Sequence, residues 1–210
     1  MGRPDPWNGM GRRVHLHEVG PRDGLQIEPA FVPTEDKIAL VDALSAAGFS
    51  KIEVTAFVSM KAIPALRDAE QVLRAVARRP GVVFAALVPD AAGAQRAVEA
   101  GADELNLVMS ASESYNRANL RRRRDQSFQS LCEAAAIAQA ANVRVNVSLS
   151  CVFGCPMEGD VADADVMHWC GRLIDKLGAG GITLCDTTGM AFPTQVARLT
   201  RAFGERWPAT

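Results

Sequence analysis

Short runs of apolar residues alternate along the chain with longer stretches in which apolar residues recur every three or four positions. The short runs are rich in Val, Ile and Leu, which favours buried β-strands. The longer stretches have the spacing of helices that bury one side. The pattern predicts six strands, over residues 14–19, 51–55, 82–88, 104–109, 143–149 and 181–185.

The helix predicted over residues 34–47 is marked at both ends. Glu35 and Asp36 stand in its first turn, where acidic side chains suit the helix dipole, and Gly48 follows as a stop. Asp125 is a candidate N-cap for the helix predicted over residues 126–141. The remaining helices are predicted over residues 66–77, 91–100, 163–177 and 194–206.

These elements predict an α/β fold with a parallel sheet. No two-residue hairpin signal joins any pair of strands, so successive strands run parallel through right-handed crossovers. A doubly wound sheet would place a Gly-rich phosphate loop after the first strand, and the segment after Val19 has the wrong glycine spacing. Polar residues instead follow the C-terminal ends of several strands, which is typical of a TIM (β/α)8-type barrel. We predict a partial barrel over residues 14–210 with about six βα units, each a predicted strand followed by a predicted helix.

A six-strand barrel would leave two parallel edges unpaired and part of its interior open. We therefore expect the missing third of the barrel to exist on a longer parent chain.

Composition narrows the class of protein. A hydrophobic share of 48% supports one ordinary core, and a formal charge of −1 gives no pull toward nucleic acid or lipid. No apolar run is long enough to span a membrane. Residues 1–13 are polar and lack a signal-peptide core, which predicts a disordered lead-in and a cytoplasmic protein. The five cysteines are an odd number, so reduced thiols are expected.

The first chemical constellation, Arg22-Asp23-Gly24-Leu25-Gln26, directly follows the first predicted strand. A carboxylate there can offer one ligand to a hard cation, and the guanidinium can offer a fixed positive charge to an oxyanion. The alternative is an ion pair that only steadies the loop.

The segment from Glu18 to Gln26, Glu-Val-Gly-Pro-Arg-Asp-Gly-Leu-Gln, closely resembles the opening motif of the 3-hydroxy-3-methylglutaryl-CoA lyases. These are metal-dependent barrel enzymes whose superfamily includes isopropylmalate synthases. Further matches follow in the family's order at residues 52–54, 57–59, 112–113, 127–129, 151–159 and 186–189.

The resemblance implies a carbon–carbon lyase that uses Mg²⁺ or Mn²⁺ to cleave a 3-hydroxyacyl-CoA into acetyl-CoA and a keto acid such as acetoacetate, as in leucine degradation and ketone-body formation. An acyl-CoA partner and a homodimer or higher homo-oligomer are expected. Two alternatives remain: a Claisen-condensing acyltransferase of the isopropylmalate synthase type, and a truncated non-catalytic barrel. The Leu-Gln ending of the motif weighs against the first, and the missing third of the barrel favours the second.

By resemblance, Asp23 is a metal ligand and Arg22 holds the thioester oxygen as it becomes an enolate. Gln26 is expected to contact the substrate. Asp186 matches the family's acidic residue after the sixth strand, where it would order Arg22 or a metal-bound water.

Glu53 alternates with Ile52 and Val54, so its carboxylate is expected to face the barrel interior. It is either a catalytic group or the buried partner of a basic residue such as Arg22.

The sequence departs from the family in two places. The His-x-His pair, the Asn and the catalytic cysteine that complete the family's site do not occur after Asp186, so the chain as written is expected to be inactive. Asn146 and Ser148 stand where typical lyases carry Arg and Tyr. Both are predicted substrate-binding residues, and the acyl group is expected to differ accordingly.

Other residues carry weaker signals. His15 and His17 share a strand face, yet they match ordinary strand positions of the family, so we interpret them as packed histidines rather than metal ligands. Cys151 and Cys155 are interpreted as buried thiols rather than a zinc site.

A basic run, Arg117 with Arg121 to Arg124, follows the fourth predicted strand. Its guanidinium groups either meet the phosphates of coenzyme A or form a solvated cluster at the start of a helix.

Overall fold

The computed structural model describes residues 15–208. The disordered lead-in predicted for residues 1–13 lies outside this part. The strands are β1 (His17–Glu18), β2 (Lys51–Ala56), β3 (Val83–Val88), β4 (Glu104–Ser110), β5 (Arg144–Ser150) and β6 (Gly181–Leu184). The α-helices are α1 (Thr34–Ala46), α2 (Ala69–Ala75), α3 (Ala91–Glu99), α4 (Glu113–Leu120), α5 (Arg124–Ala140), α6 (Asp163–Leu177) and α7 (Pro193–Arg206).

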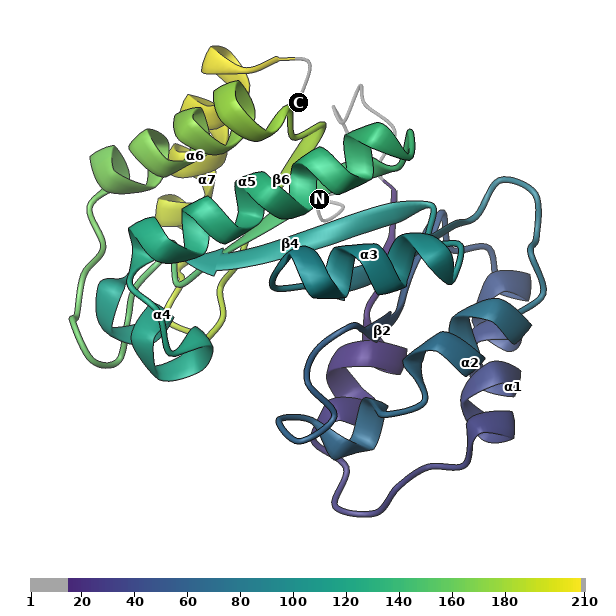
Figure 1. Cartoon of the computed structure of the whole chain (residues 1–210). Helices are drawn as coiled ribbons and strands as arrows, with labels where there is room; N and C mark the ends of the chain where they lie inside the picture. The colour runs from purple at the N-terminus through teal and green to yellow at the C-terminus, as the bar shows by residue number, and fades with distance from the viewer. Residues whose placement is uncertain (1–14, 209–210) are drawn as a thin grey trace, which may run out of the picture.

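All six strands form one parallel sheet in the order of the sequence, from β1 to β6. A doubly wound sheet would reverse its strand order at a switch point, whereas sequential parallel order is that of a (β/α)8 barrel. Neighbouring helices pack on each other outside the sheet, α1 on α2, α3 on α5 and α5 on α6 (Figure 1). The predicted partial barrel is confirmed.

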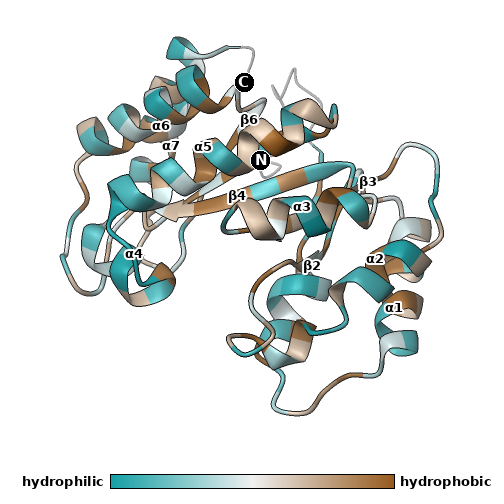
Figure 2. Cartoon of the chain, in the orientation of Figure 1, coloured by the Kyte–Doolittle hydropathy of each residue, from teal (hydrophilic) through white to brown (hydrophobic). Residues whose placement is uncertain are grey.

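The two faces of β4 differ in chemistry. On β4, Leu105, Leu107 and Met109 belong to the core that packs against the helices, while Glu104 and Asn106 alternate with them toward the interior. Figure 2 shows this alternation as hydrophobic and hydrophilic bands along β4. The outer face of β4 therefore contributes to the hydrophobic core, and its inner face carries polar side chains together with Val108, which belongs to a smaller apolar cluster.

Helix α4 is absent from the elements that the hydrophobic pattern predicts. Its signal was present: Ser112 accepts a hydrogen bond from the Tyr115 amide at 3.1 Å as an N-cap, and Glu113 stands in the first turn.

The predicted Asp125 cap of α5 is wrong, because the helix begins two residues earlier, behind Arg123. The Gln126 side chain accepts from the Arg123 amide at 2.9 Å, and Asp125 lies in the first turn, paired with Arg172. The helix predicted over residues 66–77 was too long, since a 3₁₀ turn (Pro64–Leu66) precedes a shorter α2.

Within residues 15–208, no helix combines the length and the apolar character that crossing a bilayer requires.

Candidate active site

The Arg22-Asp23 pair lies in a single π-helical turn, η1 (Gly20–Gly24), directly after β1. The amides of Arg22 and Asp23 both donate to the Val19 carbonyl, at 3.1 and 2.7 Å. Leu25 then packs against a small apolar cluster formed by Ala56, Leu66, Leu87 and Val108. Leu25 therefore anchors the turn, which explains why an apolar residue follows the Arg-Asp-Gly core.

Arg22 contacts two carboxylates. Its Nε donates to Glu53 Oε1, and its Nη1 donates to Asp23 Oδ1 at 2.6 Å. The side chains of Arg22 and Glu53 are 15% and 5% exposed, whereas that of Asp23 is 62% exposed. The carboxylate of Asp23 therefore has oxygen lone pairs open to a ligand, and that of Glu53 does not.

Glu53 faces the interior, as predicted from its alternation with Ile52 and Val54, both of which lie in the outer core. A register shift between Glu53 and Thr55 marks a bulge in β2 beside this side chain. Bulges redirect side chains and are common next to active sites.

Asn106 is a site residue that the sequence analysis missed. Its Nδ2 donates to Glu53 Oε2, and its Oδ1 accepts from Ser148 Oγ at 2.9 Å. Its signal was a single polar residue between Leu105 and Leu107 in a buried strand, where a carboxamide needs hydrogen-bond partners.

The inner face of β5 and β6, with the residue that follows β6, forms an uncharged wall beside Asn106, made of Asn146, Ser148, Thr183 and Cys185. The Asn146 amide lies 3.0 Å from both Asn106 Oδ1 and Thr183 Oγ1. A side chain at Gly181 would place its Cβ 2.6 Å from Asn146 Oδ1, so the glycine makes room for Asn146. Burial raises the pKa of the Cys185 thiol to about 11, which keeps it neutral at pH 7.

Two predicted site residues lie at the same end of the sheet without joining these contacts. Asp186, directly after β6, is exposed and accepts from the amides of Met190 and Ala191 at 2.9 and 3.2 Å. Within residues 15–208 its carboxylate has no contact with Arg22, because it closes its own loop. Gln26 is half-buried just past η1.

The residues present fit part of a metal site. Across residues 15–208, no group of three or more His, Cys, Asp or Glu side chains could hold a metal ion. Asp23 supplies one open carboxylate, whereas Mg²⁺ takes six oxygen ligands, several of which are usually water or substrate.

His17 begins the edge strand β1 and His15 lies just before it, and both side chains are exposed, so the prediction of packed side chains is wrong. Within residues 15–208, β1 is short and pairs on one side, with β2, which leaves both imidazoles largely exposed. Partial burial and the nearby Lys51 ammonium lower the pKa of His17.

Cys151 and Cys155 are buried, as predicted. Ser112 Oγ donates to Cys155 Sγ at 3.0 Å. Burial alone would raise the pKa of Cys155, but the hydrogen bonds from Ser112 and from the amides of the following loop outweigh it and lower the pKa.

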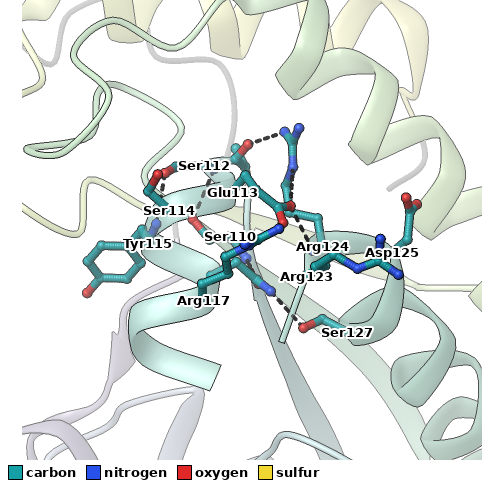
Figure 3. A network of polar contacts seen from close by, with 12 residues as sticks. Ser110, Ser112, Glu113, Ser114, Tyr115, Arg117, Arg123, Arg124, Asp125 and Ser127 are labelled. Carbon is teal, nitrogen blue, oxygen red and sulfur yellow. Dashed lines mark hydrogen bonds and ion pairs between the residues drawn. The ribbon is translucent and has the colours of Figure 1, made fainter. Parts of the chain in front are cut away.

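The basic run is largely engaged in internal contacts between α4 and α5, which Figure 3 shows around Glu113. Glu113 Oε1 accepts from Arg117 Nε at 2.8 Å, and its Oε2 accepts from the Arg124 amide at 3.0 Å. Arg124 also donates to the Ala111 carbonyl, and Arg122 donates to Ser130. These contacts favour the surface-cluster interpretation for most of the run.

A family model described as HMGL-like matches residues 13–210. The chain belongs to the HMGL-like family. It is 44% identical over 198 residues to a hydroxymethylglutaryl-CoA lyase of Bacillus subtilis, an alignment that covers 94% of this chain and 66% of the relative. A 3-hydroxy-3-isohexenylglutaryl-CoA/hydroxy-methylglutaryl-CoA lyase of Pseudomonas aeruginosa is 38% identical, with 95% of this chain and 66% of the relative covered.

Solved members of the HMGL-like family share the fold. An HMG-CoA lyase from Acinetobacter baumannii, in complex with coenzyme A and 3-methylmalate, superposes with a TM-score of 0.88 at 45% identity. The superposition covers 91% of this chain and 62% of that structure. The chain therefore spans less than two thirds of the length of these relatives.

Proposed function

We propose that the full-length protein cleaves a 3-hydroxyacyl-CoA of the 3-hydroxy-3-methylglutaryl-CoA type into acetyl-CoA and a keto acid such as acetoacetate. One observation carries the proposal. A guanidinium held by a buried carboxylate, Arg22 on Glu53, stands beside the open carboxylate of Asp23 at the C-terminal end of a barrel strand. Family membership supports the same reading.

The reaction needs positive charge where the thioester oxygen becomes an enolate oxygen. Arg22 is suited to this role because Glu53 and Asp23 take only its Nε and Nη1. A guanidinium has five N–H donors, so Nη2 and the second Nη1 hydrogen can reach a substrate oxygen. Glu53 is proposed to hold this orientation, since its own oxygens are already engaged.

Asp23 is proposed as one ligand of a divalent metal, Mg²⁺ or Mn²⁺, which when bound would act as a Lewis acid toward the substrate oxygens. Asp186 is proposed to order the loop after β6, through its contacts with the amides of Met190 and Ala191. A metal held by Asp23 would need further oxygen ligands, such as water or substrate.

Asn146, Ser148 and Gln26 are proposed to contact the acyl-CoA. Asn146 and Ser148 line the wall beside the Arg22–Glu53 pair through Asn106. Uncharged side chains at these two positions are proposed to select an acyl group that differs from 3-hydroxy-3-methylglutaryl. A homo-oligomeric state and a cytoplasmic location stay predictions.

The test is divalent-dependent release of acetyl-CoA by the purified full-length protein. We expect turnover of 3-hydroxy-3-methylglutaryl-CoA or a close analogue with Mg²⁺ or Mn²⁺, and none after treatment with EDTA. Consumption of acetyl-CoA with a 2-keto acid would instead indicate the condensing enzyme. No turnover with any 3-hydroxyacyl-CoA would indicate a non-catalytic barrel and overturn the proposal.

A further inference from the structure

One buried amide, that of Asn106 on β4, joins the Arg22–Glu53 pair to the wall formed by β5 and β6. Asn106 is 8% exposed and Glu53 is 4% exposed, so neither can turn to water for a hydrogen bond. The Nδ2 of Asn106 donates to Glu53, and its Oδ1 accepts from Ser148 Oγ at 2.9 Å.

The chemistry of the two neighbours fixes which way this amide points. An ionised carboxylate only accepts hydrogen bonds, so the NH₂ end of Asn106 must face Glu53. The Ser148 hydroxyl can then donate to the oxygen end. Turning Asn106 over would oppose its oxygen to the Glu53 carboxylate, at the cost of leaving a buried acceptor unpaired.

Glu53 is in turn fixed by one donor on each oxygen. Arg22 Nε donates to Oε1, and Asn106 Nδ2 donates to Oε2. Loss of the Asn106 amide would leave Oε2 without its donor in a buried position. A carboxylate with a single strong partner can rotate about its last side-chain bond, which is broad and soft, and Arg22 would move with it.

We infer that Asn106 is a positioning residue, which holds Glu53 so that Arg22 presents its unpaired N–H groups to the substrate oxygen. The kinetic consequence rests on the proposed function, whereas the positioning itself does not. The same amide also accepts from Ser148, so a chain of hydrogen bonds runs from the wall formed by β5 and β6 through Asn106 and Glu53 to Arg22.

The direct test is solvent exchange of the Arg22 side-chain Nε–H, followed by NMR in the full-length protein. Asn106→Leu, which keeps the volume and removes the amide, is expected to accelerate this exchange about tenfold, the factor that roughly 1.4 kcal/mol gives. The matched control is Gln71→Leu, an amide-to-leucine change at an exposed position of α2, which is expected to leave the exchange unaltered.

A second variant guards against failure of Asn106→Leu to fold. Ser148→Ala leaves the donor of Asn106 in place and removes one group that orients it, so a smaller acceleration in the same direction is expected. Unaltered Arg22 exchange in a folded Asn106→Leu protein, or in Ser148→Ala if the first does not fold, overturns the inference.

Kinetics separate this inference from the proposed function. Asn106→Leu is expected to lower kcat about tenfold and to change the KM for the acyl-CoA less than about threefold, because Arg22 acts on the developing charge. Accelerated exchange in a protein that cleaves no acyl-CoA would support the inference while the proposed function fails. An active Asn106→Leu variant with unaltered exchange and kcat would leave the function standing and remove the role of Asn106.

Discussion

Two regions of the molecule use the same arginine–carboxylate chemistry to different ends. Glu113 on α4 accepts from Arg117, one turn along the same helix, and from Arg124 at the start of α5, so the network ties the two helices together. Around Arg22 at the barrel mouth, one carboxylate is enclosed, while the other, that of Asp23, is open to solvent.

The difference teaches how to separate structural ion pairs from a candidate site. A carboxylate whose two oxygens both accept donors within the fold, as in Glu113, has little left to offer a metal or substrate. The Arg22 group retains free N–H donors beside an open carboxylate, on the inner face of the barrel. Residue type and pairing distance are alike in the two regions. The open carboxylate of Asp23 and its place at the barrel mouth distinguish the Arg22 group, since both oxygens of Glu113 already accept donors.

The largest expected effect is on turnover at the barrel mouth. Arg22→Gln is expected to lower kcat about 10²- to 10³-fold, the range found for removal of one oxyanion donor. Arg96→Gln is the matched control, since Arg96 Nε donates to Glu70 Oε1 at 2.6 Å between α2 and α3. Steady-state kinetics of both variants would measure this. An effect of Arg22→Gln confined to KM would contradict the role of Arg22 in charge stabilisation.

Changes to Asn146 and Ser148, in the wall formed by β5 and β6, should alter substrate selectivity. The double change Asn146→Arg and Ser148→Tyr restores the residues of typical lyases and fills space beside Arg22. We expect the ratio of kcat/KM for 3-hydroxy-3-methylglutaryl-CoA to that for a longer 3-substituted analogue to rise about tenfold, a size usual for pocket contacts. The ratio is the readout, because the change also disturbs Asn106. A constant ratio would remove these two residues from substrate selection.

A change in the Glu113 network should instead lower the stability of the protein. Glu113→Gln is expected to lower the free energy of unfolding at pH 7 by about 1 kcal/mol, the size of partly exposed charge-assisted contacts, and to leave kcat unaltered. Denaturant unfolding monitored by circular dichroism would measure it. A loss of turnover without loss of stability would make this region part of the site.

The difference in free energy of unfolding between wild type and Glu113→Gln should depend on pH with a definite sign. Burial alone would raise the pKa of Glu113, but hydrogen bonds from the Arg124 amide and Arg117 outweigh it and hold the folded-state pKa below the ordinary 4.5. The stabilisation by Glu113 is therefore complete above that value and is lost as the pH falls through the folded-state pKa. Unfolding curves of wild type and Glu113→Gln should converge in that acidic range.

The smallest effect is expected at the two arginines of the basic run whose guanidinium groups have no hydrogen-bond partner within residues 15–208, Arg121 and Arg123. Changing both to Gln is expected to alter the KM for the acyl-CoA less than about threefold, as for a solvated surface cluster. A tenfold or larger rise in KM, with no change in stability, would instead indicate that these arginines contact the coenzyme A phosphates.

The sequence by itself determined the class of fold and the opening motif. Periods of two and of about 3.6 residues separated strands from helices, and the Arg-Asp-Gly turn marked the end of a strand where barrel sites form. Helix α4 and the start of α5 were misjudged because several adjacent arginines and polar residues conceal the capping signals of Ser112 and Gln126.

Only the tertiary structure decided which charges are paired and which are free. Glu53, Asn106 and Ser148 lie on three different strands and are brought together by the register of the sheet, which no local pattern encodes. Asp186 is the exception, since its carboxylate accepts from the amides of Met190 and Ala191 in its own loop. Hydrogen-bond partners depend on distances between segments far apart in the chain, and those distances exist only after the strands have paired.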